Sequence, residues 1–123
     1  TTSRSNVQAL FTRLLGGDWS AVFEVVCCGE DTRCKKPDPE VYLLALQALG
    51  LAPTAALAIE DSTPGVRAAG AAGVPLLLRP SVYFPADELP EGVVGWLCPP
   101  DVPVDLALLR RVHAALGHVT AQA

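Results

Sequence analysis

Hydrophobic residues follow two different spacings along the chain, and the two spacings alternate. In four stretches they recur every three or four residues, as on one face of a helix: residues 3–15, 39–49, 63–72 and from about 103 onward. Short apolar runs rich in branched side chains lie between these stretches, as in buried strands: residues 21–26, 55–60, 76–78 and 93–97. The pattern predicts an α/β domain.

Capping residues mark the ends of the predicted helices. Ser3 or Ser5 is positioned to cap the first helix, and Asp-Pro at 38–39 and Thr-Pro at 63–64 open the second and third. Helix-ending glycines follow these three stretches: Gly16, Gly50 and Gly73. Strands that alternate with helices favour a parallel sheet covered on both faces. Ligands of such sheets bind beyond the carboxyl ends of the strands, which directs attention to residues 1–6, 29–38 and 61–65.

Composition narrows the class of protein. The 123 residues are 50% hydrophobic and 18% charged, which is enough apolar surface for one folded domain and argues against disorder. A net charge of −4 argues against a nucleic-acid partner. The longest apolar run, residues 74–78, is far too short to cross a bilayer, so we expect no membrane partner.

Four cysteines are present, and their spacing does not match a zinc site. Cys27 and Cys28 are adjacent, and the two histidines lie far along the chain. We expect reduced thiols in or near a core, which favours a reducing compartment.

The first polar cluster is Thr-Thr-Ser-Arg-Ser-Asn at residues 1–6, directly before a predicted helix. Free backbone N–H groups and the positive end of the helix dipole favour anions there. Plain capping by Ser or Thr explains the same residues.

The second cluster is Lys-Lys-Pro-Asp-Pro at residues 35–39. A lysine held before a helix by two prolines suits a fixed point charge for a phosphate. A solvated loop with two surface lysines is the alternative.

The third cluster is Glu60-Asp61, which ends an apolar strand. Two carboxylates near a core need a counter-ion or hydrogen bonds, and Mg²⁺ would supply oxygen-ligand compensation. In the alternative, Asp61 or Ser62 only bonds to the next helix. The glycines that follow do not have GxGxxG spacing, so no dinucleotide site is predicted. Together, hydroxyl, lysine and acidic pair are the groups that phosphoryl transfer needs.

From residue 1 to about residue 83, the chain resembles the haloacid dehalogenase (HAD) superfamily, in particular its CbbY-like and β-phosphoglucomutase-like branch. The likeness rests on the three clusters and on the long run AIEDSTPGVRAAGAAG at residues 58–73. It implies a three-layer Rossmann-like core with a parallel sheet, binding Mg²⁺ and a small phosphorylated substrate.

The resemblance also implies roles for individual residues. The phosphoryl group would be bound by Thr2 and neutralised by Lys36, the two catalytic residues of this chain. Asp61 would be the direct Mg²⁺ ligand and Glu60 a supporting one. Further substrate-binding residues at the phosphate end would be Ser3, Arg4 and Asn6.

The family's first motif, Asp-x-Asp-Gly-Thr/Val, does not occur in these 123 residues. It supplies the aspartate nucleophile and the general acid and base. The cap region that selects the substrate normally follows that motif, so it too is missing. We therefore expect residues 1–123 to be the C-terminal portion of a HAD-like core, inactive by itself. The family's first strand would lie between strands 21–26 and 55–60, so we expect this chain alone to fold poorly.

The complete protein is thus predicted to be a Mg²⁺-dependent phosphomonoester hydrolase that acts on a sugar phosphate through an aspartyl-phosphate. A phosphomutase on the same scaffold is one alternative. A non-catalytic domain that binds a phosphorylated ligand or a protein partner is another. We expect a cytoplasmic location, with a plastid as the alternative.

Overall fold

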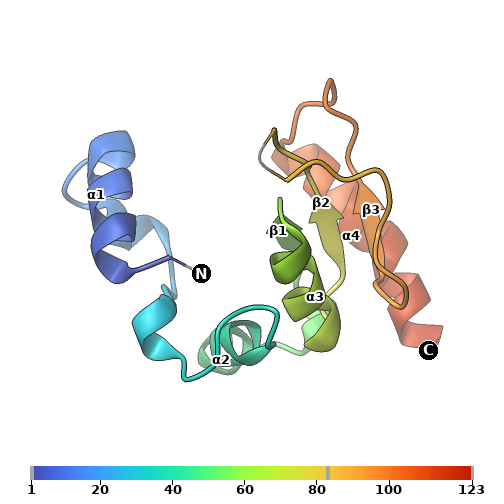
Figure 1. Cartoon of the computed structure of the whole chain (residues 1–123), viewed down its shortest axis with the longest axis horizontal. Coiled ribbons are helices and arrows are strands. Elements are labelled where there is room, and N and C mark those ends of the chain that lie inside the picture. The colour runs from blue at the N-terminus through green and yellow to red at the C-terminus, as the bar shows by residue number, and fades with distance from the viewer. Residues whose placement is uncertain (1, 83, 123) are drawn as a thin grey trace.

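The computed structural model describes residues 2–82 and 84–122. Thr1 and Tyr83, which bound the region of family resemblance, lie outside the described residues. The elements follow one another as α1 (Arg4–Leu15), η1 (Trp19–Val22), η2 (Gly29–Asp31), α2 (Glu40–Leu49), η3 (Pro53–Ala55), β1 (Ala58–Glu60), α3 (Thr63–Ala71), β2 (Leu76–Leu78), β3 (Gly95–Leu97) and α4 (Leu106–Gln122), where η is a 3-10 helix (Figure 1).

The three strands form one parallel sheet in the order β1-β2-β3. Side chains of successive strand residues point to opposite faces. Leu76 and Leu78 accordingly pack with residues of α2 and α3, whereas Leu77 packs with Leu108 and Val112 of α4. Helices thus cover both faces of the sheet, and the predicted α/β fold with three layers is confirmed (Figure 1).

The predicted cap is present at α1, and at α2 and α3 the capping position differs from the prediction by one residue. The Ser3 hydroxyl accepts the Asn6 N–H at 3.2 Å. At α2 the N-cap is Pro39 rather than Asp38, although an Asp38 carboxylate oxygen accepts the Glu40 N–H at 2.9 Å. At α3 the cap is Ser62 rather than Thr63, because the Ser62 hydroxyl accepts the N–H of Gly65 at 3.4 Å. Thr63 is the first residue of that helix.

The prediction of a strand at residues 21–26 is wrong. Trp19–Val22 is a 3-10 helix, and residues 23–28 form no strand. Three aromatic rings organise this segment: Phe11 lies 5.5 Å from Trp19 and 5.2 Å from Phe23 between ring centroids. A strand needs a neighbouring strand to bond its backbone. The resemblance places one further strand between residues 21–26 and β1, and in this structure β1 is the edge strand of the sheet.

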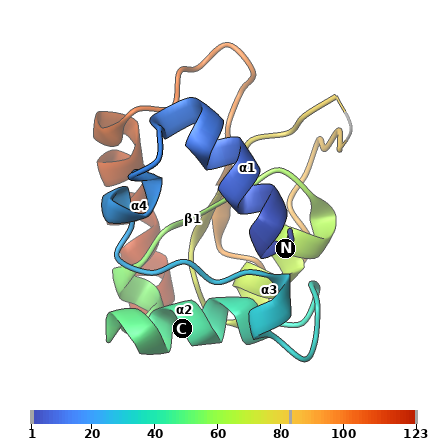
Figure 2. The same cartoon turned by 90° about the vertical axis from the view of Figure 1, so that its left-hand side faces the viewer.

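Two regions differ in how they are packed. In the N-terminal region (residues 2–31), α1 has no buried residue, and Leu14 is 65% exposed. In the sheet region (residues 40–117), Leu76 and Leu77 are fully buried. α1 stands apart from the sheet, beyond α2 (Figures 1 and 2). In the described part of the chain, the helices are all too short or too polar to span a membrane.

Candidate active site

A buried ion pair lies at the carboxyl end of β1. Glu60, the last residue of the strand, is 7% exposed, and its Oε1 atom accepts a hydrogen bond from Lys36 Nζ at 2.7 Å. Glu60 shares a sheet face with buried Ala58, which directs its side chain toward α2 and α3. The structure therefore brings together one predicted metal ligand and the predicted catalytic lysine.

Tyr42 completes this cluster, and the sequence analysis missed it. Its hydroxyl donates to the same Glu60 oxygen, and its ring centroid lies 5.5 Å from Lys36 Nζ. Burial, and then the bond to the Glu60 carboxylate and its charge, raise the pKa of Tyr42 far above its usual value of 10.0. The phenol therefore stays protonated and remains a donor at physiological pH. The available signal was a tyrosine on the apolar side of α2, since a buried hydroxyl needs a partner.

Thr2 lies at the same place as Lys36. Both line a cavity of about 220 Å³, whose walls are Thr2, Cys27, Lys36, Val41, Tyr42 and Ala45. The Thr2 hydroxyl accepts a hydrogen bond from the Asn6 side-chain amide at 3.3 Å. Thr2 and Lys36, two of the predicted phosphate-binding residues, thus line one cavity. Asn6, a third, is hydrogen-bonded to Thr2.

Arg4 and Ser3 are engaged elsewhere. The Arg4 guanidinium pairs with Asp31 at 2.5 Å, and its backbone N–H donates to the Glu30 carboxylate at 2.9 Å. The Ser3 hydroxyl caps α1. In this structure the two side chains therefore stabilise the start of α1, and neither lines the cavity with Thr2 and Lys36.

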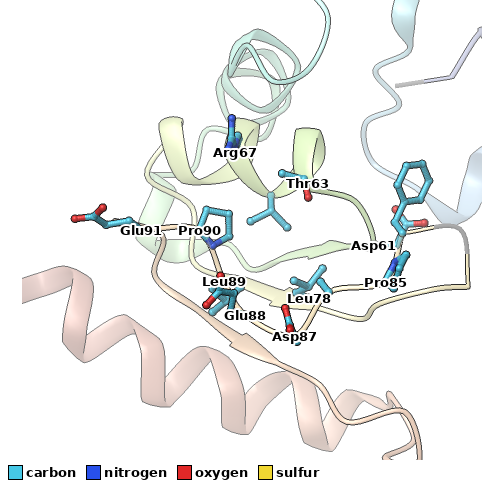
Figure 3. A pocket seen from close by; sticks show the side chains of 13 residues that line it. Asp61, Thr63, Arg67, Leu78, Pro85, Asp87, Glu88, Leu89, Pro90 and Glu91 are labelled. Atoms are coloured by element: carbon cyan, nitrogen blue, oxygen red, sulfur yellow. The ribbon is translucent and has the colours of Figure 1, made fainter.

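Asp61 lies next to Glu60 on the chain but lines a different cavity, of about 490 Å³. Figure 3 shows Asp61 and Thr63 on one side of it and the loop that carries Asp87 on the other. The Asp61 side chain is exposed, and within the described residues it has no hydrogen bond or ion pair. The exposed Asp61 carboxylate can bind an ion, and the Glu60 carboxylate is next to it on the chain. Carboxylate oxygens are ligands that fit a hard divalent cation such as Mg²⁺.

Gly65 makes room for the buried carboxylate. A Cβ atom added at this position in the first turn of α3 would lie 1.9 Å from Glu60 Oε2. Non-bonded atoms do not approach that closely, so any larger residue at position 65 would displace this carboxylate. The dipole of α3 also favours a negative charge at its N-terminal end.

A second cluster, outside the cavities, shapes the segment before α2. The Glu40 carboxylate accepts the N–H groups of Arg33 and Cys34, and these bonds hold the pKa of Glu40 below its usual range. Cys34, Asp38 and Glu40 place their potential ligand atoms within 4.8 Å of one another.

All four cysteines are free thiols, as predicted; Cys28 and Cys98 are buried, but Cys34 is exposed.

Comparisons with known proteins agree with this arrangement. A family model for haloacid dehalogenase-like hydrolases matches residues 1–73. Protein CbbY of Rhodobacter capsulatus is 43% identical over 99 residues, which cover 80% of this chain and 43% of that protein. The phosphorylated carbohydrates phosphatase of Thermotoga maritima is 41% identical over 73 residues, which cover 59% of this chain and 33% of that protein.

Solved structures give the same relationship. The crystal structure of CbbY from Rhodobacter sphaeroides in complex with phosphate matches with a TM-score of 0.71 and 38% identity, over 79% of this chain and 43% of that chain. A mutant of that protein, crystallised with xylulose-(1,5)bisphosphate, matches equally well. This chain therefore spans less than half the length of these relatives. The predicted resemblance is confirmed: the chain belongs to the haloacid dehalogenase-like hydrolase family, and within it is similar to CbbY proteins.

Proposed function

We propose that the complete protein is a Mg²⁺-dependent phosphomonoester hydrolase, to which this chain contributes the phosphate-binding and metal-binding residues. The observation that carries the proposal is the buried Lys36–Glu60 pair, with Thr2 lining the same cavity as Lys36 and Asp61 following Glu60 on the chain. The attacking aspartate, which would form an aspartyl-phosphate, comes from outside these 123 residues in this proposal.

Each side chain has a definite task in the proposed reaction. The Thr2 hydroxyl and the Lys36 ammonium bind oxygens of the phosphoryl group, and Lys36 offsets the charge that develops on them. Asp61 would be the direct ligand of the ion, and Glu60 would support it from its buried position. When bound, Mg²⁺ supplies further neutralisation of phosphate charge without a proton transfer. Stabilisation of charge by fixed groups accounts for much of the catalysis of phosphoryl transfer.

A sugar phosphate or a similar small phosphorylated metabolite is the proposed substrate class. It is supported by the phosphate and the xylulose bisphosphate bound to CbbY, and by the carbohydrate phosphatase of Thermotoga maritima. Four free thiols are consistent with a reducing compartment, and we propose the cytoplasm, with a plastid as the alternative.

The test is phosphate release by the protein expressed from its complete reading frame, with Mg²⁺ and a panel of sugar phosphates. We expect release from at least one compound and no release after chelation of the metal. Asp61→Asn and Lys36→Ala should each lower kcat by about 10²- to 10³-fold, as removal of a charge-stabilising group does. Glu24→Gln, an exposed carboxylate in the N-terminal region, is the control and should retain activity.

Three outcomes would contradict this function. Full activity of Asp61→Asn would exclude Asp61 as the metal ligand. Transfer of phosphate to a second sugar position, without release, would identify a phosphomutase. Binding of phosphate without any turnover would favour the non-catalytic ligand-binding domain.

A further inference from the structure

Glu60 has an unusual distribution of partners for a buried carboxylate. Lys36 and Tyr42 both donate to Oε1, while Oε2 lies against the Gly65 backbone. Removal of a hydrogen-bond donor from a buried carboxylate costs free energy. The orientation of the Glu60 carboxylate therefore depends on both donors, Lys36 and Tyr42. Tyr42 is the uncharged donor of the two.

We propose that Tyr42 is a positioning residue that fixes Glu60 by its hydroxyl and thereby holds Lys36 toward the cavity shared with Thr2. The Lys36 ammonium has three N–H donors, and one of them is bonded to Glu60. A fixed Glu60 therefore fixes the direction of the other two. The Tyr42 ring acts as well, because it lies 5.5 Å from Nζ and forms part of the cavity wall.

Gly65 supports the carboxylate from the opposite side. Because a Cβ at this position would overlap the Glu60 carboxyl group, the side chain is confined between Tyr42 and the start of α3. Two independent contacts thus restrict the same group. Either one, when altered, should move Lys36 without removing its charge.

The inference rests on the proposed function, and its experiment has one readout with turnover and one without. The full-length protein is prepared as Tyr42→Phe, Glu60→Gln and the double variant. Gln47→Ala, an exposed side chain on the same helix, is the control. The measurements are kcat and KM for the best substrate, and the dissociation constant for inorganic phosphate by titration calorimetry without Mg²⁺.

We expect Tyr42→Phe to lower kcat/KM about tenfold, the scale at which slight misplacement of a catalytic group acts. Phosphate affinity should fall in the same variant, while Gln47→Ala changes neither quantity. Because Tyr42 acts through Glu60, the double variant should have the same kcat/KM and phosphate affinity as Glu60→Gln alone. If Tyr42→Phe does not fold, Gly65→Ala displaces the same carboxylate from the other side and should give the same losses.

The outcomes separate this inference from the proposed function. If the parent releases phosphate and Tyr42→Phe retains both its activity and its phosphate affinity, the positioning role is overturned and the function remains. Additive losses in the double variant would also overturn it. If the parent shows no turnover, the proposed function fails, and phosphate affinity alone decides the role of Tyr42: weaker binding by Tyr42→Phe supports it, and equal binding overturns it.

Discussion

The N-terminal region and the sheet region contribute to one site but are packed very differently. Among the described residues, Trp19 and Cys28 are the only buried apolar side chains of the N-terminal region, whereas the sheet region has two continuous cores. Lys36 is anchored to the sheet through Glu60, but Thr2 is tied to its own region by the Gly29 N–H, which donates to its carbonyl at 2.9 Å. The Thr2 hydroxyl, which we propose binds phosphate, thus belongs to the region with fewer buried side chains.

The largest difference between the two regions should be in the free energy of unfolding that is lost when one leucine in each is truncated to alanine. Leu76→Ala leaves a hole in a fully buried position of β2 and should lower the free energy of unfolding by about 3 kcal/mol. Leu14→Ala removes a 65% exposed side chain from α1 and should change it by less than about 0.5 kcal/mol. Urea unfolding followed by circular dichroism measures both. Equal losses would show that α1 is packed as tightly as the sheet.

The two tryptophans report on the regions separately. Trp19 lies in the N-terminal region and Trp96 in β3, so within these 123 residues Trp96→Phe and Trp19→Phe each leave one fluorescent probe. A region with few buried contacts opens at a lower free energy than the global transition. We expect the Trp19 signal to change about 1 M urea earlier than the Trp96 signal. Coincident transitions would mean that the chain unfolds as one cooperative unit.

Two cysteines of equal burial allow a finer comparison. Cys28 and Cys98 are each 1% exposed, one in each region. Alkylation by iodoacetamide, located by peptide mass spectrometry, should reach Cys34 first because it is exposed. Cys28 should follow about tenfold faster than Cys98, since it needs only local opening. Similar rates at Cys28 and Cys98 would contradict the difference in stability.

Cys27 refines the same experiment. Burial, and then the nearby Asp31 carboxylate, raise the pKa of the Cys27 thiol above 9.0. Less thiolate is therefore present at neutral pH, so Cys27 should react more slowly than Cys34 even though it is partly accessible. A shift of the reaction to higher pH would identify this cause.

The smallest effect should come from the segment that joins the two regions. Bonds from Arg33 and Cys34 lower the pKa of Glu40 below 4.5. A lowered folded-state pKa gives stability that is present above pH 4.5 and is lost as the pH falls through the lower value. The unfolding midpoint of the parent should exceed that of Glu40→Gln at pH 6 and approach it near pH 3. Glu24→Gln is the control, and an equal pH response in both variants would rule out Glu40 as the source.

Much of the fold could be predicted from residues that act locally. Asp38, Ser3 and Gly50 mark helix ends because capping and a left-handed turn depend on neighbours in sequence. The apolar run Leu76–Leu78, which is buried along its whole length, is likewise a local signal. The strand prediction for residues 21–26 was wrong because a strand also needs a partner strand that is distant in sequence. Apolar composition alone does not show whether such a partner is present.

The candidate site shows the same division. Lys36 and Glu60 were predicted from their motifs, and the structure pairs them. The opposite treatment of two neighbours, Glu60 buried and Asp61 exposed, follows from the pleat of β1 and from the beginning of α3. Tyr42 was missed because its importance arises only where α2 crosses the end of β1, a meeting that no short motif encodes.

β1 has a further consequence for the chain as a molecule in concentrated solution. It is an edge strand, and Ile59 on it is 52% exposed. A short edge strand whose outward side chain is apolar and exposed is a template on which another polypeptide can add backbone hydrogen bonds. Self-association of the isolated chain is therefore expected to begin at this edge, and a lysine at position 59 would act as a gatekeeper against it.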